Sequence, residues 1–207
     1  ATPTATPYRP DLIADQLEVT QAIQDLTNSV RLVAKKSTYV RFHVHSRDGN
    51  HSAGAKLIAR REDGQEITLE ADPITVRADP KRWQYEDAFI FRLPSDYTEG
   101  KITLEADVNP EPTLGQRQVL EYNYANNKTT QTVVNFESVP PLNLVIYKVG
   151  YEVGGREYTA ADFHVRMLED WLRRVYPVGK VSSWRRTYSY GTGVPQAPIL
   201  NAALDTK

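Results

Sequence analysis

Apolar and polar residues alternate along most of the first two thirds of the chain, with the period of a β-strand that buries one face. The clearest stretch is 101–108, where Ile102, Leu104, Ala106 and Val108 alternate with charged or hydroxyl side chains. A strand of this kind belongs to an antiparallel sheet that packs one face on a core and leaves the other in water. The pattern therefore predicts an antiparallel sheet with a buried face.

The same alternation recurs in 37–46 and 85–94. Further strands are predicted at 55–62, 66–71, 73–76 and 129–137, and 73–76 is assigned to a sheet edge because proline is tolerated there. Turn-forming residues separate these strands, and no strong helical period occurs before about residue 138. Many short strands with turns between them predict a β-sandwich over 12–138.

The stretch VTQAIQDL, Val19–Leu26, fits both a helix and a strand when it is read alone. Its helical face has no partner helix nearby in sequence, and the strands that follow need a neighbour. We therefore interpret Leu17–Ile23 as the opening strand, with Gln21 at a kink or at an exposed edge, and residues 25–29 as the exit turn.

The pattern changes in the segment 139–207. Residues 142–151 are apolar on both faces, which predicts a strand that is buried from both sides. A helix follows, with Thr159 as its predicted cap and with Phe163, Met167 and Trp171 recurring at every fourth position.

Another strand is predicted at 179–190, so the order is strand, helix, strand. This order predicts a small α/β segment of the βαβ type with parallel strands. One such unit is too small to bury its own faces. It either packs on the sandwich or begins a larger α/β domain that continues past Lys207.

Composition narrows the possible functions. The 207 residues carry a formal net charge of −1, so no overall positive field favours nucleic acid. No apolar run is long enough for a transmembrane helix. The absence of cysteine excludes disulfides, thiol catalysis and cysteine-ligated zinc. Residues 1–11 form a Thr/Pro-rich linker or tail, which is either a tether typical of extracellular proteins or a short remnant.

Histidines are the first candidates for chemistry. His43 and His45 lie on one face of a predicted strand, with His51 near the next turn. A zinc site needs a third ligand and a second shell of partners, and Arg41 beside the pair would repel a cation. We interpret the pair as polar residues of a solvated strand face and His164 as a surface residue. No metal, cofactor or catalytic residue is predicted.

Aromatic residues are the remaining candidates. Trp184, Tyr188 and Tyr190 share strand parity, and so do Tyr122 and Tyr124. Flat rows of aromatic rings bind sugars or partner surfaces because they offer a large area at low entropic cost. These five residues are the predicted ligand or partner surface. The alternative is that the first row packs against the helix or against whatever follows Lys207.

Several stretches resemble one family of bacterial secreted proteins: Leu17–Arg41, with LEVTQAIQD; Phe91–Asn109, FRLPSDYTEGKITLEADVN; Asn126–Thr129, NNKT; and 159–181, TAADFHVRMLEDWLRRVYPVGKV. They are similar to Ig-like, CARDB-type sandwich modules that precede zinc-metallopeptidase-like domains. The resemblance implies an Ig-like sandwich at the extracellular side or cell surface. No histidine here is followed by glutamate, so the His-Glu-x-x-His zinc motif is absent and no activity is carried over.

Three functions follow from these observations. The first is a non-catalytic accessory module that binds a protein partner, a cell surface or a downstream domain of the same polypeptide. The second is a self-associating surface or adhesion protein that uses strand addition. The third, a sugar-active enzyme, is the weakest because no convergent polar constellation is visible.

Overall fold

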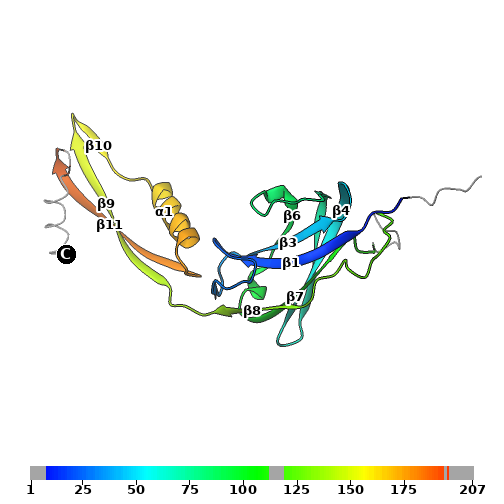
Figure 1. Cartoon of the computed structure of the whole chain (residues 1–207). Coiled ribbons are helices and arrows are strands. Elements are labelled where there is room, and N and C mark those ends of the chain that lie inside the picture. The colour runs from blue at the N-terminus through cyan, green and yellow to red at the C-terminus, as the bar shows by residue number, and fades with distance from the viewer. Residues whose placement is uncertain (1–7, 112–118, 194, 196–207) are drawn as a thin grey trace, which may run out of the picture. The chain divides into compact units, whose positions relative to one another are not determined.

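The structure is a computed structural model that describes residues 8–111, 119–193 and 195. The chain divides into two compact units, Ala1–Val139 (unit 1) and Pro140–Lys207 (unit 2). Among the described residues, the regular elements of unit 1 are β-strands and two short 3₁₀ turns, and unit 2 contains further strands and a helix (Figure 1). The predicted mainly β class is confirmed. Residues 1–7 of the Thr/Pro-rich segment lie outside the described residues.

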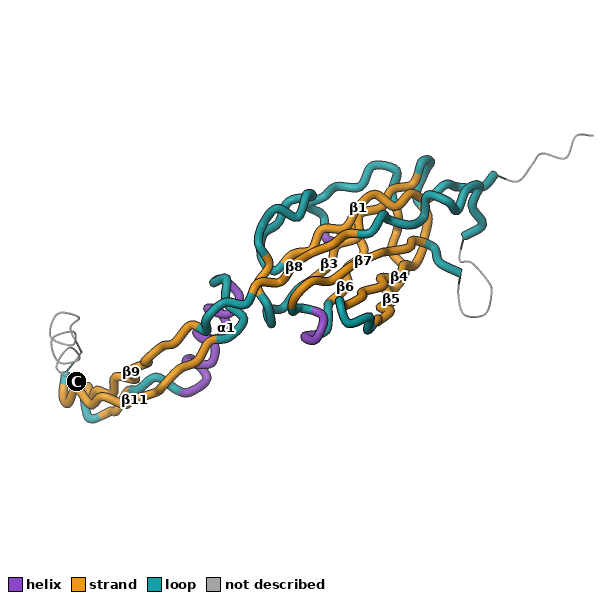
Figure 2. The backbone as a smooth tube through the Cα atoms, turned by 90° about the horizontal axis from the view of Figure 1, so that it is seen from below, coloured by secondary structure: helices purple, strands orange, loops and turns teal. Residues whose placement is uncertain are grey.

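Unit 1 is built from two sheets in the described part of the chain (Figure 2). One sheet is antiparallel and has the order β1 (Leu12–Thr20), β3 (Tyr39–Ser46), β6 (Ala88–Arg92). The other has the order β2 (Leu32–Val33), β8 (Thr132–Glu137), β7 (Gly100–Val108), β4 (His51–Arg61), β5 (Glu66–Val76). In this second sheet β2 runs parallel to β8, and the remaining neighbours are antiparallel. Short 3₁₀ turns, η1 (Tyr85–Asp87) and η2 (Ser95–Tyr97), flank β6.

Both sheets contribute side chains to one core, as in a β-sandwich. The alternating residues Val40, Phe42 and Val44 of β3 are fully buried, and so are Ile102 and Leu104 of β7. The ring of Phe42 stacks on that of Phe89 with centroids 5.9 Å apart. The period-2 pattern thus predicted which side chains of these strands enter the core.

The opening strand differs from the prediction. β1 runs from Leu12 to Thr20, so the predicted boundaries Leu17 and Ile23 are both wrong. The strand ends because Gln21 leaves the ladder. Its side-chain amide accepts a hydrogen bond from Val33 N (2.8 Å) and donates one to Val33 O (2.7 Å), which replaces a strand neighbour. Ile23 is exposed beyond this point.

Two other boundaries also differ. Residues 66–76, predicted as two strands, form the single edge strand β5, and the register irregularity opposite it lies between Ala53 and Ala55 of β4. The strand predicted at 85–94 begins only at Ala88, because Tyr85–Asp87 form the turn η1.

Unit 2 contains β9 (Leu142–Val153), β10 (Arg156–Tyr158), α1 (Asp162–Val175) and β11 (Val181–Thr192). Its sheet has the order β10-β9-β11 in the described residues, and β11 runs parallel to β9. Ala161 is the N-cap of α1 and makes no side-chain cap bond, so the predicted cap at Thr159 is wrong. No helix in the described ranges is long and apolar enough to cross a membrane.

Candidate interaction surface

Helix α1 covers one face of the β9–β11 pair (Figure 1). Glu169 on the helix accepts hydrogen bonds from Ser183 and from Arg185 (3.0 Å) on β11. Asp162 at the helix start pairs with Lys148 of β9 at 2.9 Å. Because side chains alternate along a strand, the residues with the parity of Ser183 and Arg185 face the helix.

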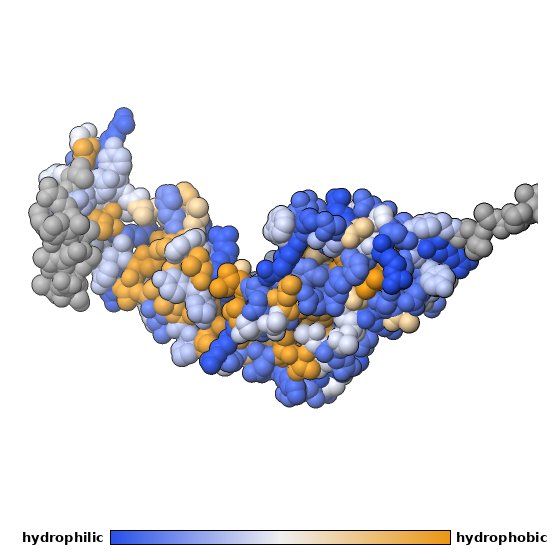
Figure 3. All heavy atoms as spheres, in the orientation of Figure 1, coloured by the Kyte–Doolittle hydropathy of each residue, from blue (hydrophilic) through white to orange (hydrophobic). Residues whose placement is uncertain are grey.

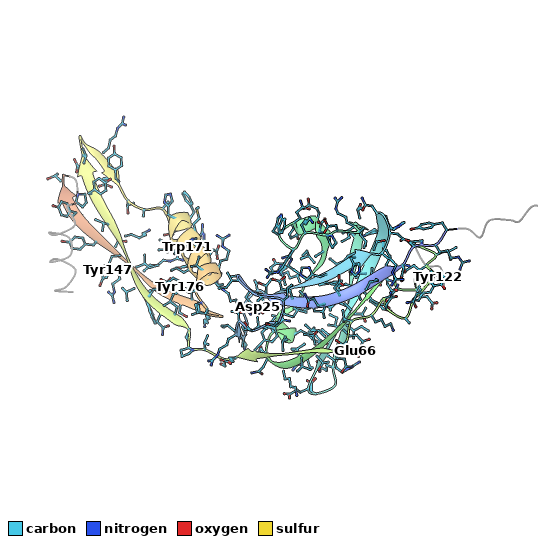
Figure 4. The ribbon with its side chains drawn as sticks, in the orientation of Figure 1. Asp25, Glu66, Tyr122, Tyr147, Trp171 and Tyr176 are labelled. Atoms are coloured by element: carbon cyan, nitrogen blue, oxygen red, sulfur yellow. The ribbon has the colours of Figure 1, made fainter. Side chains whose placement is uncertain are left out.

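The other face of the pair carries the predicted aromatic residues of β11. The register places Trp184 opposite Val145, Arg186 opposite Tyr147, and Tyr188 opposite Val149. These residues have the parity that points away from α1. Tyr147 is labelled on β9 in Figure 4. Trp184 is 59% exposed and Val145 is 56% exposed, so β9 is not buried from both sides as its sequence predicted.

An open groove of about 840 Å³ follows this face. Its lining is partly aromatic, and Arg186 brings a positive charge to it: Val145, Tyr147, Arg186, Thr187, Tyr188, Ser189. No carboxylate is among these lining residues. We call the face formed by Val145, Tyr147, Trp184, Arg186 and Tyr188 the β11 face.

Helix α1 also leaves apolar side chains exposed. Phe163, Met167, Trp171 and Val175, spaced by four residues, form a stripe along one side of the helix, and Met167 is 62% exposed. The sheet uses a different side of α1, on which Val165 is buried. Hydrophobic side chains accordingly gather over unit 2 in the space-filling view (Figure 3).

The remaining predicted aromatic residues are arranged differently. Tyr190 lies at the register shift between Ser189 and Gly191, where β11 bulges. Tyr122 and Tyr124 lie in a loop of unit 1 rather than on a strand, so their predicted strand parity is wrong. The ring of Tyr122 is 82% exposed, whereas the Tyr124 hydroxyl accepts a hydrogen bond from Glu121 N (2.9 Å).

The histidine pair contacts carboxylates. His43 Nε2 lies 2.9 Å from Glu18 and His45 Nδ1 lies 2.8 Å from Asp15. Burial lowers the pKa of His43, and the hydrogen bond to Glu18, which raises it, does not compensate. No group of three potential metal-ligating His, Cys, Asp or Glu side chains occurs among the described residues.

No protein-family model matches the chain, and no curated protein matches it. Among solved structures, a CARDB domain of a Pyrococcus furiosus protein, determined in complex with di-metal ions, shares 19% identity. The match covers 66% of this chain and 94% of that domain, with a TM-score of 0.35.

Proposed function

We propose that the chain is a non-catalytic accessory module of a secreted or cell-surface bacterial protein and that it binds a protein partner through the β11 face. The observation that carries the proposal is the exposure of Trp184 and Val145 side by side on a sheet face that no described element of unit 2 covers. In this proposal the sandwich of unit 1, of the Ig-like type, is the scaffold.

Apolar surface is unfavourable in water. A partner that covers it therefore gains binding free energy, about 25 cal/mol for each Å² of apolar surface buried. Large contiguous apolar patches are rare on the surface of soluble proteins, and where they occur they often mark interaction sites. Trp, Tyr and Arg are the residue types that dominate binding energies at protein interfaces, and Trp184, Tyr188 and Arg186 supply all three. A partner with apolar side chains and a carboxylate for Arg186 would complement the face.

The setting rests on the sequence resemblance to CARDB-type modules. In this proposal the module lies outside the cell and N-terminal to a metallopeptidase-like domain, so that a downstream domain of the same polypeptide is one candidate partner. The apolar stripe of α1 is a second surface that such a domain could cover.

Self-association by strand addition is the second candidate function. It is favoured by β11, which in the described residues pairs with β9 alone and leaves the backbone groups of its other edge free across Val181–Thr192. An open edge of this length can template a strand from another chain. Antiparallel pairing of two β11 strands would, however, bring the Arg185 and Arg186 side chains of both copies together, which is unfavourable.

Photo-crosslinking in the producing cells tests both functions. A photoreactive phenylalanine analogue replaces Trp184 in one variant and the exposed Leu120 of unit 1 in the control. We expect a discrete crosslinked product from position 184 and none from position 120. Its mass and peptide map distinguish a second protein, a second copy and a segment of the same polypeptide. Failure to crosslink at position 184 would contradict a binding role of the β11 face.

A further inference from the structure

Unit 1 carries an open pocket of about 630 Å³ on the outer face of the β1–β3–β6 sheet. Residues of β1, of β3 and of the loops 21–30 and 77–87 line it: Glu18, Thr20, Ala22, Ile23, Gln24, Arg41, Arg82, Trp83, Tyr85. None of these belongs to the aromatic residues singled out from the sequence. We call it the Trp83 pocket.

The floor of the Trp83 pocket is a charge cluster. Glu18 is only 3% exposed and lies 2.8 Å from Arg82 Nη2 and 3.6 Å from Arg41 Nη1. Burial raises the pKa of Glu18, but the hydrogen bonds from Arg82 and His43 outweigh it, so this pKa lies below its ordinary value. One carboxylate and two guanidinium groups give the pocket lining a net positive charge.

Arg82 has capacity left for a ligand. Its Nε and Nη2 donate to Glu18, and Nη2 also donates to Gln24 O at 2.7 Å. No hydrogen bond from Nη1 to another described residue occurs, and the side chain is 44% exposed. A guanidinium with a free N–H is suited to a carboxylate.

Hydrogen bonds hold the loop 21–30 in one conformation. Gln24 donates to Val19 O and to Val30 O (3.0 Å each). Asp25 accepts from the backbone N of Thr27 at 2.9 Å and of Ser29 at 3.1 Å, as well as from both hydroxyls.

The loop 77–87 is fixed in a similar way. Asp87 accepts hydrogen bonds from Arg77 Nε and Lys81 N, both at 2.8 Å. Arg41 Nη2 donates to Arg82 O at 2.5 Å. The backbone of the two loops that form the rim of the pocket is therefore preorganised in the absence of a ligand, which lowers the entropic cost of binding.

Large rings nevertheless project from this braced backbone into solvent. Trp83 is 80% exposed and Tyr85 is 71% exposed, and Ile23 from the facing loop is exposed as well. Flat rings held at low entropic cost beside an arginine are suited to a ring-shaped ligand that carries a negative charge.

We propose that the Trp83 pocket binds an acidic saccharide, with a pyranose ring against Trp83 and Tyr85 and the uronate carboxylate at Arg82. A peptide fits the pocket less well. The lining consists of side chains on a sheet face and in two loops, whereas strand addition by a peptide requires an open sheet edge with free backbone groups. This site lies in unit 1 and is independent of the partner binding proposed for unit 2.

Calorimetric titration of the whole chain with trigalacturonate tests the proposal, with the neutral galactose trisaccharide of the same linkage as the comparison. We expect saturable binding of the acidic sugar, with Kd on the order of 1 mM or tighter, and at least tenfold weaker binding of the neutral sugar. Raising the salt concentration should weaken the acidic sugar because the arginine contact is screened.

Trp83→Ala and Tyr85→Ala should each weaken trigalacturonate binding by about tenfold, because each removes a stacking surface. Tyr8→Ala, which removes another largely exposed tyrosine of unit 1 outside the Trp83 pocket, should bind as the unaltered chain does. Far-UV circular dichroism identifies any variant that fails to fold. If one of the two ring variants fails, trigalacturonate binding by the other tests the proposal.

Three results would overturn the proposal: no saturable binding of trigalacturonate, equal binding of the neutral sugar, or unchanged binding by both ring variants. Tighter binding of a polyglutamate peptide than of trigalacturonate, lost in Trp83→Ala, would likewise reject the saccharide and assign the pocket to acidic peptides.

Discussion

At the scale of single residues, the pair Glu18 and His43 shows how burial and hydrogen bonding set protonation. Both side chains lie on the outer face of the β1–β3–β6 sheet, beneath the loop that carries Arg82. Glu18 is held charged by Arg82 and His43, while burial keeps His43 neutral at neutral pH. Because the Glu18 carboxylate can only accept, the Nε2–H of His43 donates to it.

The stability of unit 1 should therefore fall as the pH is lowered. Both pKa values are lower in the folded chain than in the unfolded chain, so the unfolded chain binds more protons. The loss should begin near the ordinary histidine pKa of 6.5 and continue below the ordinary glutamate pKa of 4.5. Urea denaturation between pH 8 and pH 4 measures it.

His43→Gln should flatten the part of this dependence near pH 6, because the group that takes up the proton is gone. His164→Gln, at an exposed histidine of α1, is the matched control and should leave the dependence unchanged. A His43→Gln profile that matches the unaltered chain would show that His43 does not cause the loss.

At the scale of elements, strand ends and loops are set by side chains that imitate backbone partners. The amide of Gln21 bonds both backbone groups of Val33 and also donates to Thr38 Oγ1 at 2.9 Å. At the other end of the sandwich, the buried Glu121 accepts hydrogen bonds from Leu12 N and from Asn127 Nδ2, each at 2.7 Å. These contacts fix where β1 begins and ends.

Gln21→Ala should lower the free energy of unfolding by about 1–3 kcal/mol, because it leaves the buried N–H of Val33 without its acceptor. Gln131→Ala, at an exposed glutamine just before β8, is the matched control and should change stability by less than about 0.5 kcal/mol. Chemical denaturation of the two variants gives the difference, and equal values would mean that the Gln21 bonds add nothing.

The elements of unit 2 leave apolar side chains exposed that their sequence pattern would place in a core. The stripe of Phe163, Met167 and Trp171 was predicted from its period, and the period is correct, but the stripe does not enter a core in the described residues. Periodicity reports which side chains share a face and cannot report what covers that face. For the same reason the expected burial of β9 from both sides failed at Val145.

At the scale of the whole molecule, the two units differ in how many of their apolar side chains they bury. The buried cluster that fills the sandwich is drawn from residues 12–136. In unit 2, by contrast, Val165 is the one buried hydrophobic residue among the described residues.

A chain that ends at Val139 should consequently fold by itself. Its core is complete within unit 1, so we expect one cooperative urea transition and a β-type circular dichroism spectrum. A segment that starts at Pro140 should show weaker cooperativity and should bind a hydrophobic dye. An unfolded 1–139 chain would contradict this division of the stability.

The sequence by itself determined the local features of this protein: the mainly β class, the inward faces of β3 and β7, the change of pattern near residue 139, and the shared face of Trp184 and Tyr188. Each follows from a period of two or of about four residues, which is a property of neighbours along the chain.

Only the tertiary structure decided the features that depend on distant partners. Glu18 and Arg82 are 64 residues apart in sequence and meet through the fold. Trp83 is exposed on the loop 77–87, which is held by a hydrogen bond from Arg41 to Arg82 O and by one from Lys81 N to Asp87 within the loop. No local sequence pattern distinguishes such a tryptophan from one in a core. Contacts of this range depend on how strands and loops pack, which hydrophobic periodicity does not encode.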